Sequence, residues 1–471
     1  MSMYVSNYIS NEEISKWKNG DNIILKAETG QGKSFFIQNK LLKYTTDNFK
    51  GNICHLVHRD LLKQQASLMS TIDVISYQTI ETRYKYNIGE QLDNYDYIVA
   101  DEAHSAFLDS DFNKYSDITL NSLINNNRAI KIYLSATPEL LTEYFKENNI
   151  EYTLIDNMPK THRVKSVELY KNDDHLIQRL QNIDCKALVF KNSKEKIFDM
   201  TNKFMSCTYI TSDTKDSKVY QTLIEDEMFN SQILLATNVI DAGINIKDDK
   251  VKIVHIDSID LANVKQQLGR VRNNKVKLMM KINHGNKFKG KLRRYNEIKN
   301  NIDLWITNPK EIYIKLGRDF AYYTGYMIQD SKTGERVLNK IRYFKLRKDI
   351  EFLSSLIDAG ESEFIKRVFE YLGINTKETK ITFTKDILDE TSGCLLINKY
   401  LELDYFNERT KEKFCNDIFS TELKKNYNKS KVLKISTINK MLEELGLNYK
   451  IKSKRIRICG KQKYVWYLTT K

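Results

Sequence analysis

The chain has 471 residues, of which 41% are hydrophobic and 29% are charged, and its formal net charge is +14. This length exceeds a single hydrophobic core and predicts about three or four domains. The sequence has no apolar run of roughly 18 residues, and its first residues lack the basic start and apolar stretch of a secretory signal. We therefore expect a cytoplasmic globular protein that does not engage a membrane.

Cysteine and histidine spacing gives no sign of a disulfide framework or a transition-metal site. The six cysteines are widely scattered, no two of them stand at a Cys-x-x-Cys spacing, and the seven histidines do not cluster. No metal other than Mg²⁺ is therefore expected.

The positive charge is concentrated in two stretches. Residues 285–299 hold six basic residues against one glutamate, and residues 430–471 hold eleven against two glutamates. Their net charges of +5 and +9 equal the whole excess of +14. Such clustering is typical of a protein that binds a polyanion, most plausibly nucleic acid, but a solvated lysine-rich surface explains the charge equally well.

In chain order, the first chemically informative stretch is a candidate phosphate-binding loop at Ala27 to Ser34. The apolar run Asn22 to Leu25 precedes it, and a helix-compatible segment from Ser34 to Tyr44 follows, which gives the order strand, glycine-rich turn and helix. The glycines allow the backbone to turn tightly, so that successive N–H groups and the helix start face one phosphate. The candidate nucleotide-binding residues here are Thr29, Gly30, Gln31, Gly32, Lys33 and Ser34.

Several short apolar runs follow, and each ends in polar residues. In the first part of the chain these are Asn52 to Val57, Asp73 to Ser76, Tyr95 to Ala100 and Ile130 to Leu134. Strands that alternate with helices predict a parallel α/β sheet whose active edge lies at the strand C-termini. After a polar stretch around residues 157–163 the pattern restarts, with Ala187 to Phe190, Cys207 to Ile210, Gln232 to Ala236 and Val251 to Ile256.

Beyond Met280 the pattern changes. Apolar residues recur at helical spacing in Arg342 to Ala359 and Ser362 to Leu372, so this region is expected to be mainly α. Near the C-terminus, a helix at Ser436 to Leu445 ends at Gly446. It precedes a basic hairpin formed by Lys454 to Cys459 and Lys463 to Leu468, with its turn at Gly460 to Gln462. A helix followed by a basic hairpin indicates a winged helix.

The sequence Asp101-Glu102-Ala103-His104 stands at the end of a predicted strand, where phosphoryl transfer needs acidic groups. Hydrolysis requires one carboxylate to hold Mg²⁺ and another group to position or deprotonate the attacking water. Asp101 suits the first task and Glu102 the second. A solvated acidic turn is the alternative, but such a turn rarely follows a phosphate loop in this order.

Five motifs in order resemble those of superfamily 2 helicases of the DEAH type. They are Thr29 to Ser34, Asp101 to His104, Ser135-Ala136-Thr137, Thr237 to Gly243, and Gln266 to Arg272. The resemblance covers about residues 20 to 275, and within it the chain is similar to helicases of phages and mobile elements in low-GC bacteria.

The resemblance implies roles for individual residues. Lys33 and Ser34 would bind phosphate and Mg²⁺, Asp101 would hold Mg²⁺, and Glu102 would activate water. The residues that would couple the nucleotide to domain movement are Ser135, Thr137, His104 and Gln266. Arg270 and Arg272 would act as arginine fingers, which reach the γ phosphate from the second domain. The residues that would line the nucleic-acid strand are Arg59, Thr79, Thr211 and Thr237, although ordinary surface or capping roles are as well supported for each.

Three departures from the family pattern qualify these roles. The last motif ends Gly269-Arg270-Val271-Arg272-Asn273 where many relatives have Gly-Arg-x-x-Arg, which favours Arg270 as the finger. Gly243 and Asn245 are the candidate nucleotide-binding residues of the motif that begins at Thr237, but Asn245 occupies the place where relatives often carry an aspartate, which weakens its assignment to the ribose. No adenine-reading glutamine motif precedes Lys26; Trp17 or Tyr8 is able to stack on the base, but core packing explains each.

The sequence thus predicts two tandem RecA-like parallel-sheet α/β domains, a mainly α region and a winged-helix-like domain. The expected domain boundaries are 1–150, 151–284, 285–428 and 429–471. The expected function is an ATP- and Mg²⁺-dependent DNA helicase or translocase that works with replication, recombination or repair proteins. The alternatives are an RNA helicase or remodeller, and a nucleic-acid-binding loader or regulator with a weak ATPase core.

Overall fold

The computed structural model describes most of the chain, and the contacts of the chain divide it into two units. The described residues are 4–28, 30–48, 51–58, 72–86, 88, 92–111, 113, 115–158, 162–241, 244–272, 275–282, 285–317, 325–329, 333–360, 363–384, 400, 403–418, 433–444, 449–458 and 461–470. The first unit comprises residues 1–167 with 184–380, and the second comprises residues 168–183 with 381–471. The first unit contains two parallel sheets, which we call the first lobe (residues 4–158) and the second lobe (residues 162–167 with 184–282).

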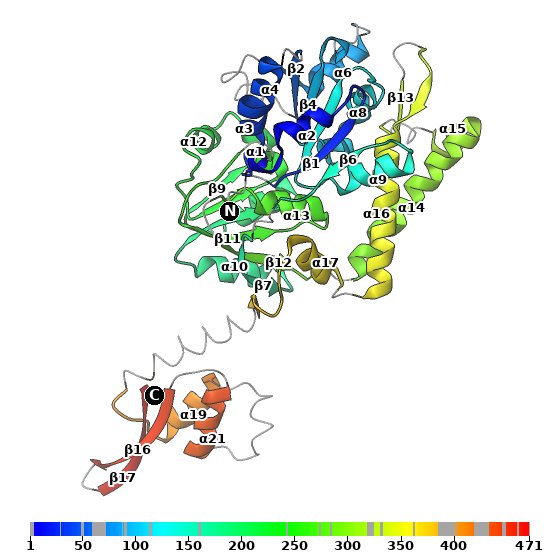
Figure 1. Cartoon of the computed structure of the whole chain (residues 1–471). Helices are drawn as coiled ribbons and strands as arrows, with labels where there is room; N and C mark the ends of the chain where they lie inside the picture. Colours follow the sequence, from blue (N-terminus) through cyan, green and yellow to red (C-terminus); the bar gives the residue numbers. More distant parts are fainter. Residues whose placement is uncertain are drawn as a thin grey trace. The chain divides into compact units, whose positions relative to one another are not determined.

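The first lobe is built around a six-stranded sheet with the strand order β3-β2-β4-β5-β1-β6 (Figure 1). Every neighbouring pair of these strands is parallel. The strands are β1 (Asn22–Lys26), β2 (Ile53–Val57), β3 (Asp73–Ser76), β4 (Tyr97–Asp101), β5 (Ile130–Ser135) and β6 (Thr153–Ile155). The helices are α1 (Val5–Tyr8), α2 (Asn11–Lys16), α3 (Lys33–Phe35), α4 (Leu42–Asp47), α6 (Tyr77–Lys85), α7 (Ser105–Leu108), α8 (Ser116–Ile124) and α9 (Glu139–Glu147). A π-helical segment, Phe36–Leu41, joins α3 to α4.

Both faces of this sheet are buried, because alternate residues of the central strands point to opposite sides. Ile24 of β1 and Tyr133 of β5 belong to one core cluster. Their neighbours Ile23 and Ile132 belong to the cluster on the other face. This two-sided burial explains the continuous apolar runs in the sequence, and it leaves the strand ends as the places where polar residues accumulate.

The second lobe contains most of a seven-stranded sheet with the order β15-β7-β12-β11-β8-β10-β9, where β15 is Lys380–Phe383, and the neighbouring strands from β12 to β9 are parallel. The strands are β7 (Val164–Tyr170), β8 (Lys186–Phe190), β9 (Cys207–Ile210), β10 (Ile233–Ala236), β11 (Val251–Ile256) and β12 (Val276–Lys281). The helices are α11 (Lys194–Thr201), α12 (Lys218–Asp226) and α13 (Leu261–Leu268). The prediction of two tandem parallel α/β sheets is therefore confirmed, although the sequence reading did not anticipate β6, β7 and β12.

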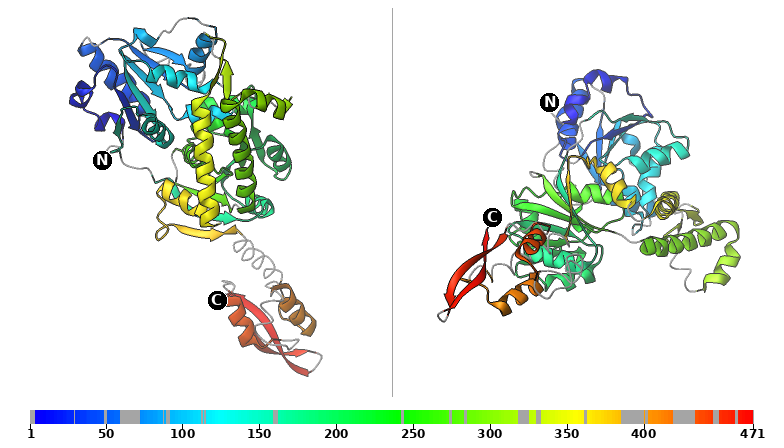
Figure 2. Two further views of the ribbon diagram at one scale, coloured as in Figure 1. Left: turned by 90° about the vertical axis from the view of Figure 1, so that its right-hand side faces the viewer. Right: turned by 90° about the horizontal axis from the view of Figure 1, so that it is seen from below.

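A helical region follows the second lobe and packs against the first lobe. Its elements are α14 (Gly285–Thr307), α15 (Pro309–Leu316), β13 (Met327–Gln329), β14 (Arg336–Leu338), α16 (Lys340–Ala359) and α17 (Glu363–Leu372). The long helices α14 and α16 lie side by side (Figure 2). The ring of Phe344 on α16 packs 5.8 Å from Phe107 and 5.2 Å from Tyr144, measured between centroids. An ion pair between Arg347 and Glu147, 2.6 Å long, closes the edge of this contact.

The second unit ends in a small helix-and-hairpin module. The elements of this module are α19 (Glu408–Ile418), α21 (Ile435–Glu444), β16 (Tyr449–Ile458) and β17 (Lys461–Thr470), whereas α10 (Asp173–Gln181) and β15 (Lys380–Phe383) are the other elements of the second unit. Asn439 joins α21 to β16, because its side chain donates to the carbonyl of Ile451 at 3.0 Å and accepts from the same residue's N–H at 2.7 Å. The predicted helix and hairpin are present and the hairpin strands are longer than expected; Gly446 and Gly460 lie outside the described residues. The winged-helix assignment and the four domain boundaries stay predictions.

Within the part of the chain that the structure describes, none of the helices combines the length and the apolar character needed to cross a membrane.

Candidate active site

The phosphate loop connects the end of β1 to the start of α3. Gly30 and Gly32 have φ values of +90° and +73°, a region that residues with a Cβ rarely occupy, which explains the two glycines. The side chain of Gln31 closes the loop by accepting from the N–H of Glu28 at 2.7 Å. Lys33, the first residue of α3, is buried, whereas Ser34 is exposed. Thr29 and Gly243 lie outside the described residues.

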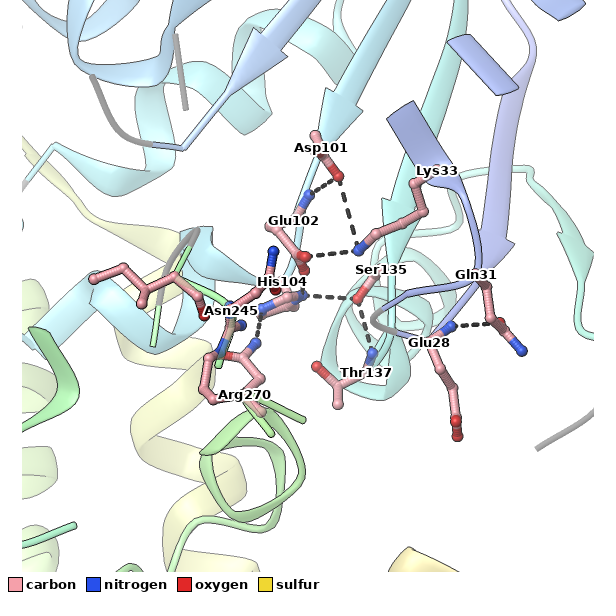
Figure 3. A network of polar contacts seen from close by, with 12 residues as sticks. Glu28, Gln31, Lys33, Asp101, Glu102, His104, Ser135, Thr137, Asn245 and Arg270 are labelled. Atoms are coloured by element: carbon pink, nitrogen blue, oxygen red, sulfur yellow. Dashed lines mark hydrogen bonds and ion pairs between the residues drawn. The ribbon is translucent and has the colours of Figure 1, made fainter. Parts of the chain in front are cut away.

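Lys33 points at the two carboxylates that follow β4 (Figure 3). Its Nζ lies 2.6 Å from Glu102 Oε1 and 3.8 Å from Asp101 Oδ1. The parallel order β4-β5-β1 brings these groups together, since the carboxyl ends of the strands share one edge of the sheet. Glu102 has a φ of +52°, an unusual conformation for a residue with a side chain, and such strain is commonly found at functional sites.

Both carboxylates are held in the ionised form. Burial alone would raise the pKa of Asp101, but Lys33 and His55 outweigh it and lower that pKa to about 2. The pKa of Glu102 is also lowered, because Lys33 and His104 outweigh the effects of burial and of Asp101. The site therefore offers two anionic oxygen groups next to one ammonium group, a set able to engage a metal-bound phosphate.

A polar chain runs from these carboxylates to the second lobe. His104 Nδ1 lies 2.8 Å from Ser135 Oγ, which in turn accepts from the N–H of Thr137 at 3.0 Å. On its other side His104 contacts Gln266 of α13 through its Nε2 atom. Burial, outweighing the opposing charge of Glu102, lowers the pKa of His104 to about 4, so the imidazole is neutral. The four residues predicted to couple the lobes thus lie in one connected chain.

The two predicted finger residues occupy different places. The Nη1 atom of Arg270 donates to the carbonyl of Ile244 at 3.4 Å, within the second lobe. The Nη1 atom of Arg272 lies 3.1 Å from the position that a Cβ on Gly30 would take, so its guanidinium end reaches the phosphate loop. Its Nε donates to Asn245 Oδ1 at 2.7 Å. The geometry therefore favours Arg272 over Arg270 as the group nearest the phosphate, contrary to the order of preference drawn from the motif.

Three residues near the phosphate loop were not found from the sequence. Arg163, just before β7, places its Nη2 atom 3.6 Å from the same Cβ position on Gly30. Lys265 of α13 forms a 3.2 Å ion pair with Glu28 of the loop. Tyr4 is 53% exposed, and its Cδ1 atom lies 3.0 Å from the Cβ position of Gly32. No motif marks these residues, because tertiary packing brings them to the loop: Arg163 and Lys265 come from the second lobe, and Tyr4 comes from the start of the first lobe.

The two aromatic residues considered for stacking on the base lie in or against the core, in agreement with the core-packing role. Trp17 is only 8% exposed and belongs to a core cluster of the first lobe, and Tyr8 packs against the same cluster. Core packing therefore accounts for both residues, whereas Tyr4 is the exposed aromatic group beside the loop.

The residues predicted to contact nucleic acid are spread over three places. Thr79 Oγ1 lies 2.9 Å from Ser76 Oγ at the start of α6, and Thr211 caps the short 3₁₀ turn at residues 212–214. Thr237 lines a cavity of about 1680 Å³ between the lobes and the helical region. The walls of this cavity carry seven carboxylates and five basic side chains, so charge does not mark it as a nucleic-acid channel. Arg59 lies outside the described residues.

The basic C-terminal stretch forms most of the β16–β17 hairpin. No acidic residue occurs between Tyr449 and Lys471, whereas eight lysines and arginines do. Among them, Lys450, Lys452 and Lys454 are exposed at alternate positions of β16 and so share one face of the strand. The ammonium group of Lys454 lies 5.1 Å from the ring centroid of Tyr467. The hairpin therefore presents positive charge together with aromatic surface.

No group of three or more histidine, cysteine, aspartate or glutamate side chains gathers into a metal cage among the described residues. A magnesium ion in this site would accordingly depend on few protein ligands together with phosphate oxygens, which is the usual arrangement for this ion.

Comparison with known proteins gives two family matches in the same order as the motifs. Residues 63–140 match the family described as "Type III restriction enzyme, res subunit", and residues 171–274 match "Helicase conserved C-terminal domain". The first match contains the residues from Asp101 to Thr137, and the second contains those from Thr237 to Arg272. No curated protein gives a significant match to the sequence.

Solved structures similar to this chain include those of a yeast protein and an archaeal protein. S. cerevisiae Dbp5 bound to RNA and ADP BeF3 has 14% identity and a TM-score of 0.44, over 78% of this chain and 87% of that chain. A DEAD box protein from the hyperthermophile Methanococcus jannaschii has 19% identity and a TM-score of 0.31, over 56% of this chain and 82% of that chain.

Proposed function

We propose that this chain, whose two family matches support a superfamily 2 nucleic-acid helicase, is a DEAH-type ATPase that moves along DNA and unwinds it. One observation carries the proposal: Lys33 and Glu102 of the first lobe and Arg272 of the second lobe converge on one phosphate loop. A site assembled from two lobes is complete only when they meet, so the occupancy of the site is linked to lobe position. That link is what a motor requires.

The first lobe supplies the groups that bind and activate. Lys33, now paired with Glu102 and Asp101, would exchange those carboxylates for the β and γ phosphates of ATP. Asp101, ionised by its surroundings, and the exposed hydroxyl of Ser34 offer the oxygen ligands that Mg²⁺ prefers. The ion would neutralise charge on the phosphates. Once Lys33 moves to phosphate, Glu102 is released to orient the attacking water.

The second lobe would supply a positive charge that stabilises the transition state and one end of the hydrogen-bonded chain that links the lobes. Arg272 would face the γ phosphate across Gly30. The chain from Ser135 through His104 to Gln266 would transmit nucleotide state from the first lobe to α13. Since His104 is neutral, this chain works as oriented hydrogen bonds rather than as an ion pair.

DNA is the proposed substrate. The restriction-enzyme family matched by residues 63–140 supports DNA, and the basic hairpin formed by β16 and β17 supplies lysines for phosphate contacts and aromatic rings for stacking. In this proposal Thr79, Thr211, Thr237 and Arg59 contact the strand on the two lobes. A cytoplasmic role in replication, recombination or repair, a mobile-element origin and a winged-helix C-terminal domain are part of the same proposal.

ATP hydrolysis measured with single-stranded DNA, single-stranded RNA or no nucleic acid tests the proposal. We expect stimulation by DNA, loss of turnover in Lys33→Ala and Glu102→Gln, and unchanged turnover in Lys43→Ala, an exposed lysine one helix further along. Stimulation by RNA alone would instead identify an RNA helicase or remodeller. Binding of nucleic acid without stimulated hydrolysis would identify a loader or regulator.

A further inference from the structure

Arg163 stands where the chain enters the second lobe, directly before β7. Its Nη1 atom donates to the carbonyl of Val271 at 2.8 Å and lies 3.4 Å from the carbonyl of Arg272. Its own carbonyl accepts from the N–H of Val276 at 2.8 Å. Arg163 therefore forms hydrogen bonds to the residues on either side of Arg272 in sequence, which fixes the backbone that carries Arg272.

Asn245 holds the side chain of the same arginine. Its Oδ1 accepts from Arg272 Nε at 2.7 Å, while the N–H of Arg272 donates to the carbonyl of Ile246 at 2.9 Å. With its backbone and Nε fixed, Arg272 turns its Nη1 end toward Gly30. Asn245 thus contacts an arginine of the cleft rather than standing free to hold the ribose.

The charged guanidinium of Arg272 is destabilised at this position unless a negatively charged group lies beside it. Burial, together with the charges of Arg270 and Arg163, lowers the pKa of Arg272 to about 9. A guanidinium held beside two others gains most when an additional negative group enters the cleft. Because the direction of the Arg272 guanidinium is fixed in advance, its side chain need not reorganise when a negatively charged group binds.

We propose that Arg163 and Asn245 are positioning residues for ATP hydrolysis, which fix Arg272 from its backbone and from its side chain so that it faces the phosphate loop. The inference rests on the proposed ATPase function and adds two residues that act through the finger. A lysine would be a poor replacement for Arg163, since it lacks the planar fork that donates to a carbonyl while leaving a second nitrogen beside Gly30.

The variants Arg163→Ala, Asn245→Leu and Arg272→Ala, together with the two double variants that contain Arg272→Ala, test this in the full chain. We expect Arg163→Ala and Asn245→Leu each to lower kcat by about 10- to 100-fold, since misplacement of a catalytic group by about 1 Å has effects of that size. The KM for ATP and the affinity for ADP should change less than about twofold, because both residues would act through Arg272 on the transition state. Asn245→Asp keeps the acceptor oxygen and should retain most of the turnover.

The double variants separate positioning from an independent effect. If both residues act through Arg272, removing them in the Arg272→Ala background should cause no further loss. Arg128→Ala is the control: Arg128 is an exposed arginine just before β5, at the edge of the sheet opposite the phosphate loop, and its replacement should leave turnover unchanged.

Binding of ADP with aluminium fluoride, compared with binding of ADP alone, gives a readout that does not depend on turnover. Arg163→Ala and Asn245→Leu should weaken the first complex by more than about tenfold and leave the second unchanged. Multiplicative losses of kcat in the double variants, or equal losses of affinity for both complexes, would overturn the inference. Turnover of the unmodified chain with DNA separately decides whether the proposed function holds.

Discussion

The neutral, buried His104 makes a specific prediction about acid stability. Its imidazole is fully enclosed between Ser135 and Gln266, and burial lowers its pKa from 6.5 to about 4. Glu102 and Asp109 oppose this shift, whereas Lys33 and His58 reinforce it. Because the folded state resists protonation at this residue, the unfolded state binds more protons between these two pKa values, and the stability that His104 contributes falls as the pH falls.

The size of the effect follows from the two pKa values. At pH 7.5 nearly all of the imidazole is neutral in both states, so the contribution is close to zero. At pH 5 the unfolded chain is mostly protonated at this histidine and the folded chain is not, which costs the folded state about 2 kcal/mol. The variant His104→Gln keeps an amide that donates and accepts but cannot titrate, so it should be free of this loss.

Trp17 allows the first lobe to be observed separately. The chain has three tryptophans, and Trp17 packs in the first-lobe core. In a background with Trp305→Phe and Trp466→Phe, urea unfolding followed by fluorescence at pH 7.5 and pH 5, without nucleotide or Mg²⁺, reports on this lobe. We expect the free energy of unfolding of His104→Gln, relative to its parent, to rise by about 2 kcal/mol between these pH values. A difference that is the same at both pH values would refute a neutral, buried His104.

Burial raises the pKa of Asp117, in the first turn of α8, to about 7, so its charged form destabilises the folded state increasingly as the pH rises from about 4 to 7. Asp117→Asn should therefore raise the midpoint of thermal unfolding more at pH 8 than at pH 5, and equal changes at the two pH values would contradict this. Gly30→Ala should lower ATP turnover, because a φ of +90° strains alanine and the added Cβ would lie 3.1 Å from Arg272 Nη1. Gly290→Ala, whose Cβ would have nothing within 4 Å, is the control, and equal turnover in the two variants would argue against the close approach of Arg272. If the exposed ring of Tyr4 stacks on the base, Tyr4→Ala should weaken ATP binding about tenfold while Tyr4→Phe does not, and a loss in both variants would exclude stacking as the cause.

The residues at the strand ends could be located from the sequence because each follows an apolar run. The run before Asp101 becomes β4 and the run before Ser135 becomes β5, and both strands are buried along their length except for the last residue of β4. A strand buried on both faces must be apolar throughout, so a sudden change to polar residues marks its end. The same rule locates Glu102, whereas Lys33 follows from the glycine-rich loop after β1, and the structure brings these two residues within hydrogen-bonding distance.

The contacts across the cleft could not be found in this way. Arg163 precedes β7, a strand that the sequence reading missed, and no periodic pattern indicates that its side chain reaches Gly30. The motif position of Asn245 makes it a candidate nucleotide-binding residue, and the absence of the family's aspartate weakens that assignment, but neither fact indicates that its side chain accepts from Arg272. Such contacts depend on how two separately folded sheets meet, which local hydrophobic pattern does not encode.

The charges around the phosphate loop explain why this meeting of lobes would favour nucleotide. Five basic side chains lie at the cleft: Lys33, Arg163, Lys265, Arg270 and Arg272. Three carboxylates face them: Glu28, Asp101 and Glu102. Basic side chains outnumber carboxylates in this set, which would favour an anion such as a nucleotide phosphate beside the loop. Without an incoming anion, bringing the arginines of the second lobe against the loop leaves buried cations incompletely paired, which opposes closure. In the proposed function, an incoming anion would pair with these arginines and favour the lobes lying together, so charge pairing would link the state of the nucleotide to the position of the lobes.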